Sequence, residues 1–469
     1  MKGILMVILF FCLCLTPLGT GHSLFAGQID MLINKLVEKG ILTASEAKEL
    51  IQDLQQEGAR EEATIKEVAT ETAKEVVKEE SEKGSFELPS WVKKIKPFGD
   101  LRLRHDSQWK DYDTSDSTRN RERFRLRFGV KSQVTDSTEV GIRLASGSGF
   151  QNTTNQSFDS HGRGKNIFID RAYAKWKANK NFTLLGGKVK NHLFTTPLVW
   201  DPDVNPEGLS EALNYRINDK FSLFANFEQW FIEEISSTND DPTLLAFQLG
   251  TEVKPKKNMK LQFGATYYEY LKMDRIKYDI DDIRDTETFL GYNNKYGQQM
   301  VFDSAGELLN EWGCLELGAK FSVKELLPVP FSVFGDYIVN FDADIDELTS
   351  KGVAYASTDP ADLLAYGSDD RDMGWLVGFS LGNKKKKKDW YMKYHYQVLE
   401  DYAFPAVFVD SDFHGGGTNN QGHYIHGRYF ITDKIQARAT GFITERENES
   451  KDGKFDENRI QLDIVIDFP

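Results

Sequence analysis

In the decamer RERFRLRFGV, residues 121–130, arginine alternates with Phe or Leu from Arg123 to Phe128. The three alternating arginines are Arg123, Arg125 and Arg127. A guanidinium is charged at every physiological pH and binds oxyanions through paired hydrogen bonds. Three of them on one surface would attract or repel charged solutes, which is the chemistry of selective permeation.

A spacing of two residues positions these arginines on one face of a β-strand. Similar alternation recurs along the chain, for example at 101–104, 142–144, 390–398 and 459–468. A lipid-facing arginine near the middle of a bilayer costs roughly 2–4 kcal/mol. Three on one strand would cost on the order of 10 kcal/mol, which is comparable to the stability of a whole domain. We therefore expect the apolar face to contact lipid and the arginines to face a water-filled lumen.

The chain as a whole predicts an all-β transmembrane barrel of about 16 antiparallel strands. After the N-terminus no run of about 18 apolar residues exists, which excludes membrane-spanning helices. From Phe98 onward we count sixteen strand candidates, and the connectors between them alternate in length. Short connectors such as 135–137 alternate with long ones such as 107–120 and 269–310. Even-stranded outer-membrane barrels have this pattern, with short periplasmic turns and long outer loops.

The N-terminal region predicts export followed by helices. Residues 1–26 have the charged start and apolar core of a secretory signal peptide. Residues 27–85 form a predicted helical periplasmic segment, in which Thr43 and Glu46 have the spacing of a capping box. The near-heptad spacing of apolar residues in its second half fits a short coiled coil and a solvated helical linker equally well. The barrel then occupies residues 86–469.

Composition and motif content exclude several other classes of protein. The net charge of −14 argues against nucleic acid as a partner. Once the signal peptide is removed, Cys314 is the one remaining cysteine, so neither a disulfide framework nor a cysteine metal site is expected. The sequence has no zinc helix motif, phosphate loop or nucleophile elbow. We therefore expect no enzymatic activity, no cofactor and no metal.

Several long motifs resemble those of the putative porins of Gram-negative bacteria. They occur in the same order and cover nearly the whole mature chain: LVEKGILTASEA (36–47), RERFRLRFGVK (121–131), IDRAYAKW (169–176), LVWDPDVNPEG (198–208), GWLVGFSLGNKKKKKDW (374–390) and DSDFHGGGTNNQGH (410–423). The resemblance implies a pore-forming barrel in the cell outer membrane and, by analogy with porins, a homotrimer. One position departs from the pattern of outer-membrane barrels, which usually end on an aromatic residue, because Pro469 follows Phe468.

The candidate site residues are the charged groups expected in the lumen. Arginines of the first three strands should form one basic wall, extended by lysines of the fifth strand: Arg102, Arg104, Arg123, Arg125, Arg127, Arg143, Lys188 and Lys190. In the alternative interpretation, some of them lie at strand ends and contact head groups or loops. The third long connector stands where trimeric porins fold a loop inward, and we expect Asp201, Asp203 and Glu207 to face the wall across a constriction. Alternatively, Asp201 and Asp203 cap a turn on the outer rim.

We therefore predict an outer-membrane porin of a Gram-negative bacterium, which forms a water-filled channel for passive diffusion of small hydrophilic solutes. The basic wall favours anions weakly, and acidic loops such as 279–285 oppose this preference. The alternative is a structural anchor in the outer membrane whose helical arm binds the cell wall or a partner. Open-channel conductance separates the two functions.

Overall fold

The chain divides in the computed structural model into two units, Met1–Leu88 and Pro89–Pro469, which are described separately. The structure describes residues 94–112, 115–236, 240–277, 279, 281, 288–290, 298, 300–324, 328–344, 348, 371–447 and 455–468, together with 43, 45 and 46. In the first unit, the backbone N–H of Thr43 donates to Glu46 Oε2 (2.8 Å), and that of Glu46 donates to Thr43 Oγ1 (3.4 Å). These are the two hydrogen bonds of the predicted capping box. The rest of the predicted helical segment and the signal peptide lie outside the described residues.

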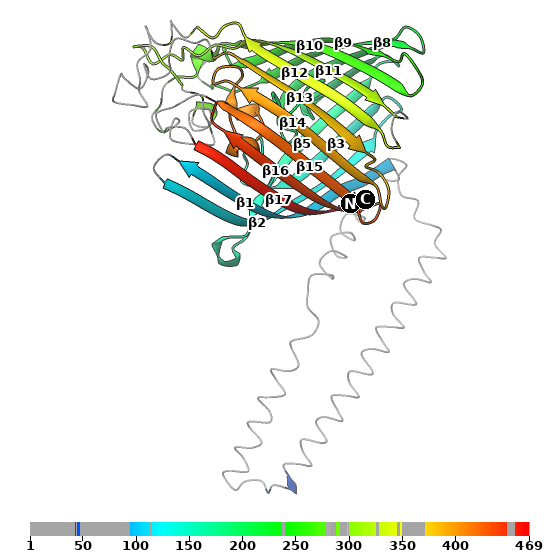
Figure 1. Cartoon of the computed structure of the whole chain (residues 1–469), viewed down its shortest axis with the longest axis vertical. Coiled ribbons are helices and arrows are strands. Elements are labelled where there is room, and N and C mark those ends of the chain that lie inside the picture. Colours follow the sequence, from blue (N-terminus) through cyan, green and yellow to red (C-terminus); the bar gives the residue numbers. More distant parts are fainter. Residues whose placement is uncertain are drawn as a thin grey trace. The chain divides into compact units, whose positions relative to one another are not determined.

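The second unit is a closed antiparallel β-barrel (Figure 1). Its described residues form sixteen wall strands, as the sequence predicts. These strands are β1 (Ile95–Tyr112), β2 (Ser115–Gln133), β3 (Thr138–Ser146), β5 (Ile167–Lys177), β6 (Phe182–Lys188), β7 (Glu207–Arg216), β8 (Phe221–Phe231), β9 (Thr243–Val253), β10 (Met259–Leu271), β11 (Gly313–Val323), β12 (Phe331–Asn340), β13 (Met373–Gly382), β14 (Trp390–Leu399), β15 (Asn420–Phe430), β16 (Ile435–Glu445) and β17 (Phe455–Phe468). Neighbours in chain order pair with one another, and β1 also pairs with β17, which closes the ring. The short strand β4 (Gln156–Ser157) pairs with β2 from within a loop.

Side chains alternate between the two faces of the wall, as the arginine pattern predicts. On β2, Arg125 is 6% exposed, whereas Leu126 and Phe128 on the opposite face are 37% and 46% exposed. On β17, Arg459 is buried inside the barrel and Ile460 is exposed outside it. The apolar side chains are therefore free to contact hydrocarbon, and the arginines are removed from it.

Ring closure between β1 and β17 requires a close approach of the two strands. Gly99 lies opposite Phe468 in the strand register. A Cβ atom on Gly99 would lie 2.3 Å from the Phe468 ring and 2.4 Å from the backbone oxygen of Arg127. Because glycine has no side chain, the Phe468 ring can occupy this space between β1 and β17.

The connectors alternate in length, and one of the predicted long connectors is wrong. Short turns such as 134–137 lie at one end of the barrel, and long loops such as 189–206 and 400–419 begin at the other end. The predicted loop 107–120 is instead a hairpin, because β1 and β2 stay paired as far as Tyr112 and Ser115. A ladder satisfies backbone groups whatever the side chains are, so these polar residues can extend the strands.

The main hydrophobic core of the described residues lies inside the barrel, at the end that carries the long loops. It packs loops 189–206 and 400–419, together with part of 272–312, against the inner faces of β8–β14. Short 3₁₀ turns occur within these loops: η3 (Met273–Arg275), η4 (Ala406–Phe408) and η5 (Phe413–Gly415). A fourth, η2 (Ser160–Gly162), lies between β4 and β5. Among the described residues, no helix is long and apolar enough to cross a membrane.

The change Ile464→Arg should destabilise the barrel, because Ile464 faces outward near the middle of the apolar stretch of β17. We expect the free energy of unfolding to fall by about 2–4 kcal/mol, as for arginine at the bilayer midplane. Urea titration of the barrel in phospholipid vesicles measures this value. Val134→Arg is the matched control, since Val134 adjoins a short turn, where the loss should be about 0–1 kcal/mol. Equal losses for both variants would contradict the membrane-facing assignment.

Candidate functional site

A row of charged residues crosses the inner wall of the barrel. Arg428 of β15 lies opposite Arg438 of β16, and Arg438 lies opposite Asp463 of β17. Asp463 lies opposite Arg104 of β1, which lies opposite Arg123 of β2. Directly opposite residues on adjacent strands are about 5 Å apart at Cβ. These five residues, which we call the arginine row, thus hold four guanidiniums beside a single carboxylate.

Carboxylates on the strands neutralise part of this wall. Asp463 accepts hydrogen bonds from Nε and Nη2 of Arg104 at 2.7 and 3.0 Å. Asp100 binds both Arg125 and Arg127 at 2.7 Å. Such paired, charge-assisted hydrogen bonds fix the orientation of each guanidinium plane and neutralise part of the positive charge.

Asp106 binds several further guanidiniums near the long-loop end. Its distances are 2.7 Å to Arg459, 2.5 Å to Arg121 and 3.7 Å to Arg123. The sequence analysis did not single out Asp100 or Asp106. Each lies two residues from a predicted pore-lining arginine, so extension of the same alternation would have found both.

Asp203, from loop 189–206, reaches the basic wall. Its Oδ1 lies 3.3 Å from Arg127 and 4.0 Å from Arg125, and its Oδ2 accepts a hydrogen bond from Thr154 at 3.0 Å. Burial opposes ionisation of this carboxyl, but Arg125 and Arg127 hold its pKa below the usual value. Asp203 is therefore charged and faces the arginines.

Asp412, from loop 400–419, makes the same kind of contact with other arginines of the inner wall. It lies 2.9 Å from Arg104 and 2.9 Å from Arg459. Burial alone would raise the pKa of Asp412, but Arg459 and Arg104 outweigh this effect and hold the pKa well below its usual value. This contact could not be predicted from the sequence, because nothing in the connector pattern indicates that this loop turns inward.

Asp201 joins the two loops and contacts no guanidinium within salt-bridge distance among the described residues. Its carboxylate accepts the backbone N–H groups of Asp203 (2.7 Å) and Ser411 (3.0 Å). Burial raises its pKa well above the usual value, and the neighbouring Asp410 and Asp203 raise it further. Asp201 therefore caps turns, and it does so inside the barrel, where it is 6% exposed.

The remaining predicted residues lie in three places. Arg102 is buried and donates to Asn155, and Arg143 is buried against Asp170. Lys188 pairs with Glu207 at 2.6 Å, and the Glu207 side chain is 65% exposed, so this carboxylate pairs with a lysine and not with the arginine row. Lys190 lies two residues beyond the end of β6. No group of three or more His, Cys, Asp or Glu residues in the described parts of the chain could hold a metal ion.

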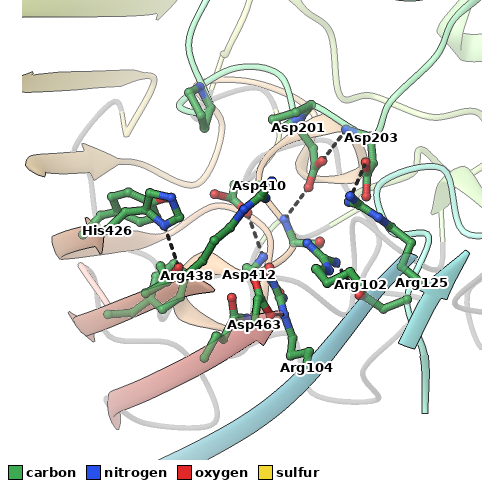
Figure 2. A pocket seen from close by; sticks show the side chains of 18 of the residues that line it. Arg102, Arg104, Arg125, Asp201, Asp203, Asp410, Asp412, His426, Arg438 and Asp463 are labelled. Atoms are coloured by element: carbon green, nitrogen blue, oxygen red, sulfur yellow. Dashed lines mark hydrogen bonds and ion pairs between the residues drawn. The ribbon is translucent and has the colours of Figure 1, made fainter. Parts of the chain in front are cut away.

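Four cavities that share lining residues lead from the long-loop end towards the short-turn end. Their volumes are 510, 230, 390 and 860 Å³ in that order. The first two share Asn152 and Asp412, the next two share Pro197, and the last two share Phe194 and Gln262. Figure 2 shows arginines of the wall and aspartates of both loops around the 230 Å³ cavity. We call this cavity, which has the smallest volume of the four, the constriction.

The sequence of this chain matches one protein family along most of its length. The family described as putative porin matches residues 107–293 and 280–468. The chain belongs to the putative porin family. This porin is an outer-membrane channel of a Gram-negative bacterium, and its family and fold are those of a channel rather than an enzyme.

Several solved structures are similar to this chain at low sequence identity. OprB of Pseudomonas putida is 12% identical, with a TM-score of 0.47, and the match covers 80% of this chain and 95% of that chain. The outer membrane channel DcaP of Acinetobacter baumannii is 15% identical, with a TM-score of 0.40 and coverage of 80% and 97%. OmpF of Salmonella typhi, in complex with daunomycin, is 8% identical, with a TM-score of 0.43 and coverage of 80% and 97%. No curated protein matches the porin.

Aromatic packing holds loop 189–206 inside the lumen of the porin. Trp200 is 3% exposed, and its ring centroid lies 5.3 Å from Trp230, 5.3 Å from Phe404 and 5.0 Å from Phe408. Its Nε1–H donates to Tyr268 Oη at 3.0 Å. The loop is thus fixed both to the wall and to loop 400–419.

Polar contacts fix the same loop to the neighbouring strands. Thr195 donates to Glu316 of β11 and Thr196 donates to Asp336 of β12, both at 2.6 Å. These contacts and the packing of Trp200 set the position of Asp203 opposite the arginines.

The change Trp200→Ala should loosen loop 189–206, because it removes the aromatic contacts to the wall and to the second loop. We expect a loss of about 3–5 kcal/mol in the free energy of unfolding, as for other buried tryptophans, and a larger, noisier single-channel current. Urea titration and planar-bilayer recording measure the two effects. Trp375→Ala is the control, since Trp375 is on the outer face and should leave the current unchanged. An unaltered current in Trp200→Ala would show that this packing does not set the constriction.

Proposed function

We propose that the porin passes small hydrophilic solutes by passive diffusion through the 230 Å³ constriction, and that the constriction favours anions. The observation that supports this most directly is its charge. Five arginines and five aspartates line the cavity. One of these carboxyls, Asp201, makes no salt bridge among the described residues, and burial raises its pKa well above the usual value, which favours its neutral form. The arginines therefore exceed the charged carboxylates.

The separation of charge within the cavity would also sort solutes by their dipoles. Guanidiniums project from β1, β2, β15 and β16, and the aspartates of the two loops face them. Opposite charges on the two sides of a narrow aqueous path create a transverse field, and a solute with separated charges aligns with it. Assembly into a homotrimer and contact of the helical segment with the cell wall remain predictions.

Replacement of Arg123, Arg125 and Arg127 by alanine should lower the anion-over-cation permeability ratio several-fold, because three positive charges leave the inner wall of the barrel. Reversal potentials in planar bilayers under a KCl gradient measure this ratio. The triple lysine variant keeps the charges and should retain most of the anion preference. Arg163→Ala, an exposed residue of the loop between β4 and β5 that lines none of the four cavities, should leave the ratio unchanged. An unaltered ratio in the triple alanine variant would contradict the proposed selectivity, and an inserted barrel without current would favour the structural anchor.

Lowering the pH from about 7 to about 5 should increase the anion preference. Burial raises the pKa of Asp410 to about 6, and the neighbouring Asp412 raises it further. Asp410 also lies near Lys393 and Arg459, which oppose this rise. The carboxyl is charged above its pKa and neutral below it, so the constriction loses one negative charge as the pH falls.

Reversal potentials at the two pH values test this expectation. In Asp410→Asn the group is neutral throughout, so the pH-dependent rise should disappear. Burial also raises the pKa of Asp401, to about 7, but Asp401 does not line this cavity. The same rise in wild type and in Asp410→Asn would assign the effect to another group.

A further inference from the structure

Two guanidiniums of the arginine row have no carboxylate partner among the described residues. Arg428 and Arg438 lie directly opposite each other on β15 and β16. Arg428 donates from Nε to His426 at 2.7 Å, and Arg438 donates from Nε to the side-chain oxygen of Gln436 at 3.1 Å. Asp463, the single carboxylate of the row, accepts two hydrogen bonds from Arg104. Within the described part of the chain, neither Arg428 nor Arg438 makes a salt bridge.

Such a pair is unfavourable unless an anion comes between its members. Like charges directly opposite each other on adjacent strands destabilise a sheet. The guanidiniums of Arg428 and Arg438 both line the 230 Å³ cavity, where a solute can reach them. Each guanidinium has five N–H donors, so most of their hydrogen-bonding capacity remains unused by the protein.

A third guanidinium adds to this positive surface. Arg102 lines the same cavity, is 7% exposed and makes no salt bridge among the described residues. In the described part of the chain, its one hydrogen-bond partner is Asn155, and its Nε is buried without a partner. A buried, incompletely bonded guanidinium that faces a cavity is favourable only if water or an anion completes its bonds.

Aromatic rings form another part of the cavity wall. The rings of His395 and Tyr424 are stacked with centroids 4.5 Å apart, and the Phe442 ring packs edge-on against Tyr424 at 5.4 Å. All three residues line the cavity, and Pro197 of loop 189–206 lines it as well. Aromatic side chains therefore form one part of the cavity wall, and guanidiniums form another.

We propose that Arg428 and Arg438, assisted by Arg102, bind the carboxylate of a small organic acid whose flat apolar body lies against the rings of His395, Tyr424 and Phe442. This inference rests on the proposed function and names a solute class for the same constriction. A carboxylate matches the fork of a guanidinium and would separate the two like charges. An inorganic anion would satisfy the guanidiniums but leave the ring surface without a contact.

The test uses the full-length porin and benzoate as the probe. A ligand that binds the folded state raises the melting temperature, so thermal unfolding in detergent measures binding without any current. We expect benzoate to raise the melting temperature more than acetate or inorganic phosphate does at equal concentration. Benzoate should also reduce the chloride current in planar bilayers. Equal effects of phosphate and benzoate would overturn the assignment to organic acids.

Variants of the pair assign the effect to its residues. Each of Arg428→Gln and Arg438→Gln should raise the half-saturating benzoate concentration by about tenfold or more, as expected for the loss of a charge-assisted hydrogen bond. Arg216→Gln is the matched control and should bind benzoate as wild type does. Wild-type affinity in both Arg428→Gln and Arg438→Gln would overturn the proposal.

One further variant covers the case in which a glutamine variant fails to fold. Arg428→Glu places a carboxylate opposite Arg438, and its neighbour on the other side is Tyr391, so we expect this variant to melt at a higher temperature than wild type and to lose the benzoate response. A retained response in this variant would contradict the site. A porin that conducts selectively without binding benzoate would refute this inference alone, whereas one that binds benzoate without conducting would refute the proposed function.

Discussion

The permanent charge of the arginine side chains constrains this structure, because a guanidinium can face water or a carboxylate but not hydrocarbon. Alternation along β2 and β17 places arginine inside the wall and Phe, Leu or Ile outside it. Closure of the ring then concentrates positive charge from strands at both ends of the chain on one part of the lumen. Arg104 and Asp463 illustrate this, since they are 359 positions apart in the sequence and share two hydrogen bonds.

The carboxylates that form salt bridges with these arginines have two different roles. Those on the strands, such as Asp100 and Asp463, fix individual guanidiniums and stabilise the wall. Those on the loops, Asp203 and Asp412, hold the loops against the wall and narrow the path. Because a charge buried in the lumen is unfavourable until it is paired, the same contacts that neutralise the arginines also shape the constriction.

The lumen is divided between polar and apolar packing. On the side of β8–β14, Trp200 and its aromatic neighbours form a core like that of a soluble domain. On the side of β15–β17 and β1–β2, charged residues surround cavities. The apolar core positions the loops, and the charged side leaves room for solutes. Asp201, buried between the two loops, connects these regions through backbone hydrogen bonds.

The sequence by itself determined the class of fold, the sixteen strands, the lipid-facing and lumen-facing sides and the family, because strand alternation is a local property with a period of two. It failed at 107–120, where polar residues extend a hairpin, since backbone pairing does not require apolar side chains. Alternation would also have revealed Asp100 and Asp106. Only the tertiary structure decided that Asp412 reaches Arg104, that Glu207 pairs with Lys188 and that Arg428 meets Arg438. The contact between Arg104 and Asp412 joins distant segments and depends on inward loop packing. The other two depend on the register of neighbouring strands, which alternation with a period of two does not specify.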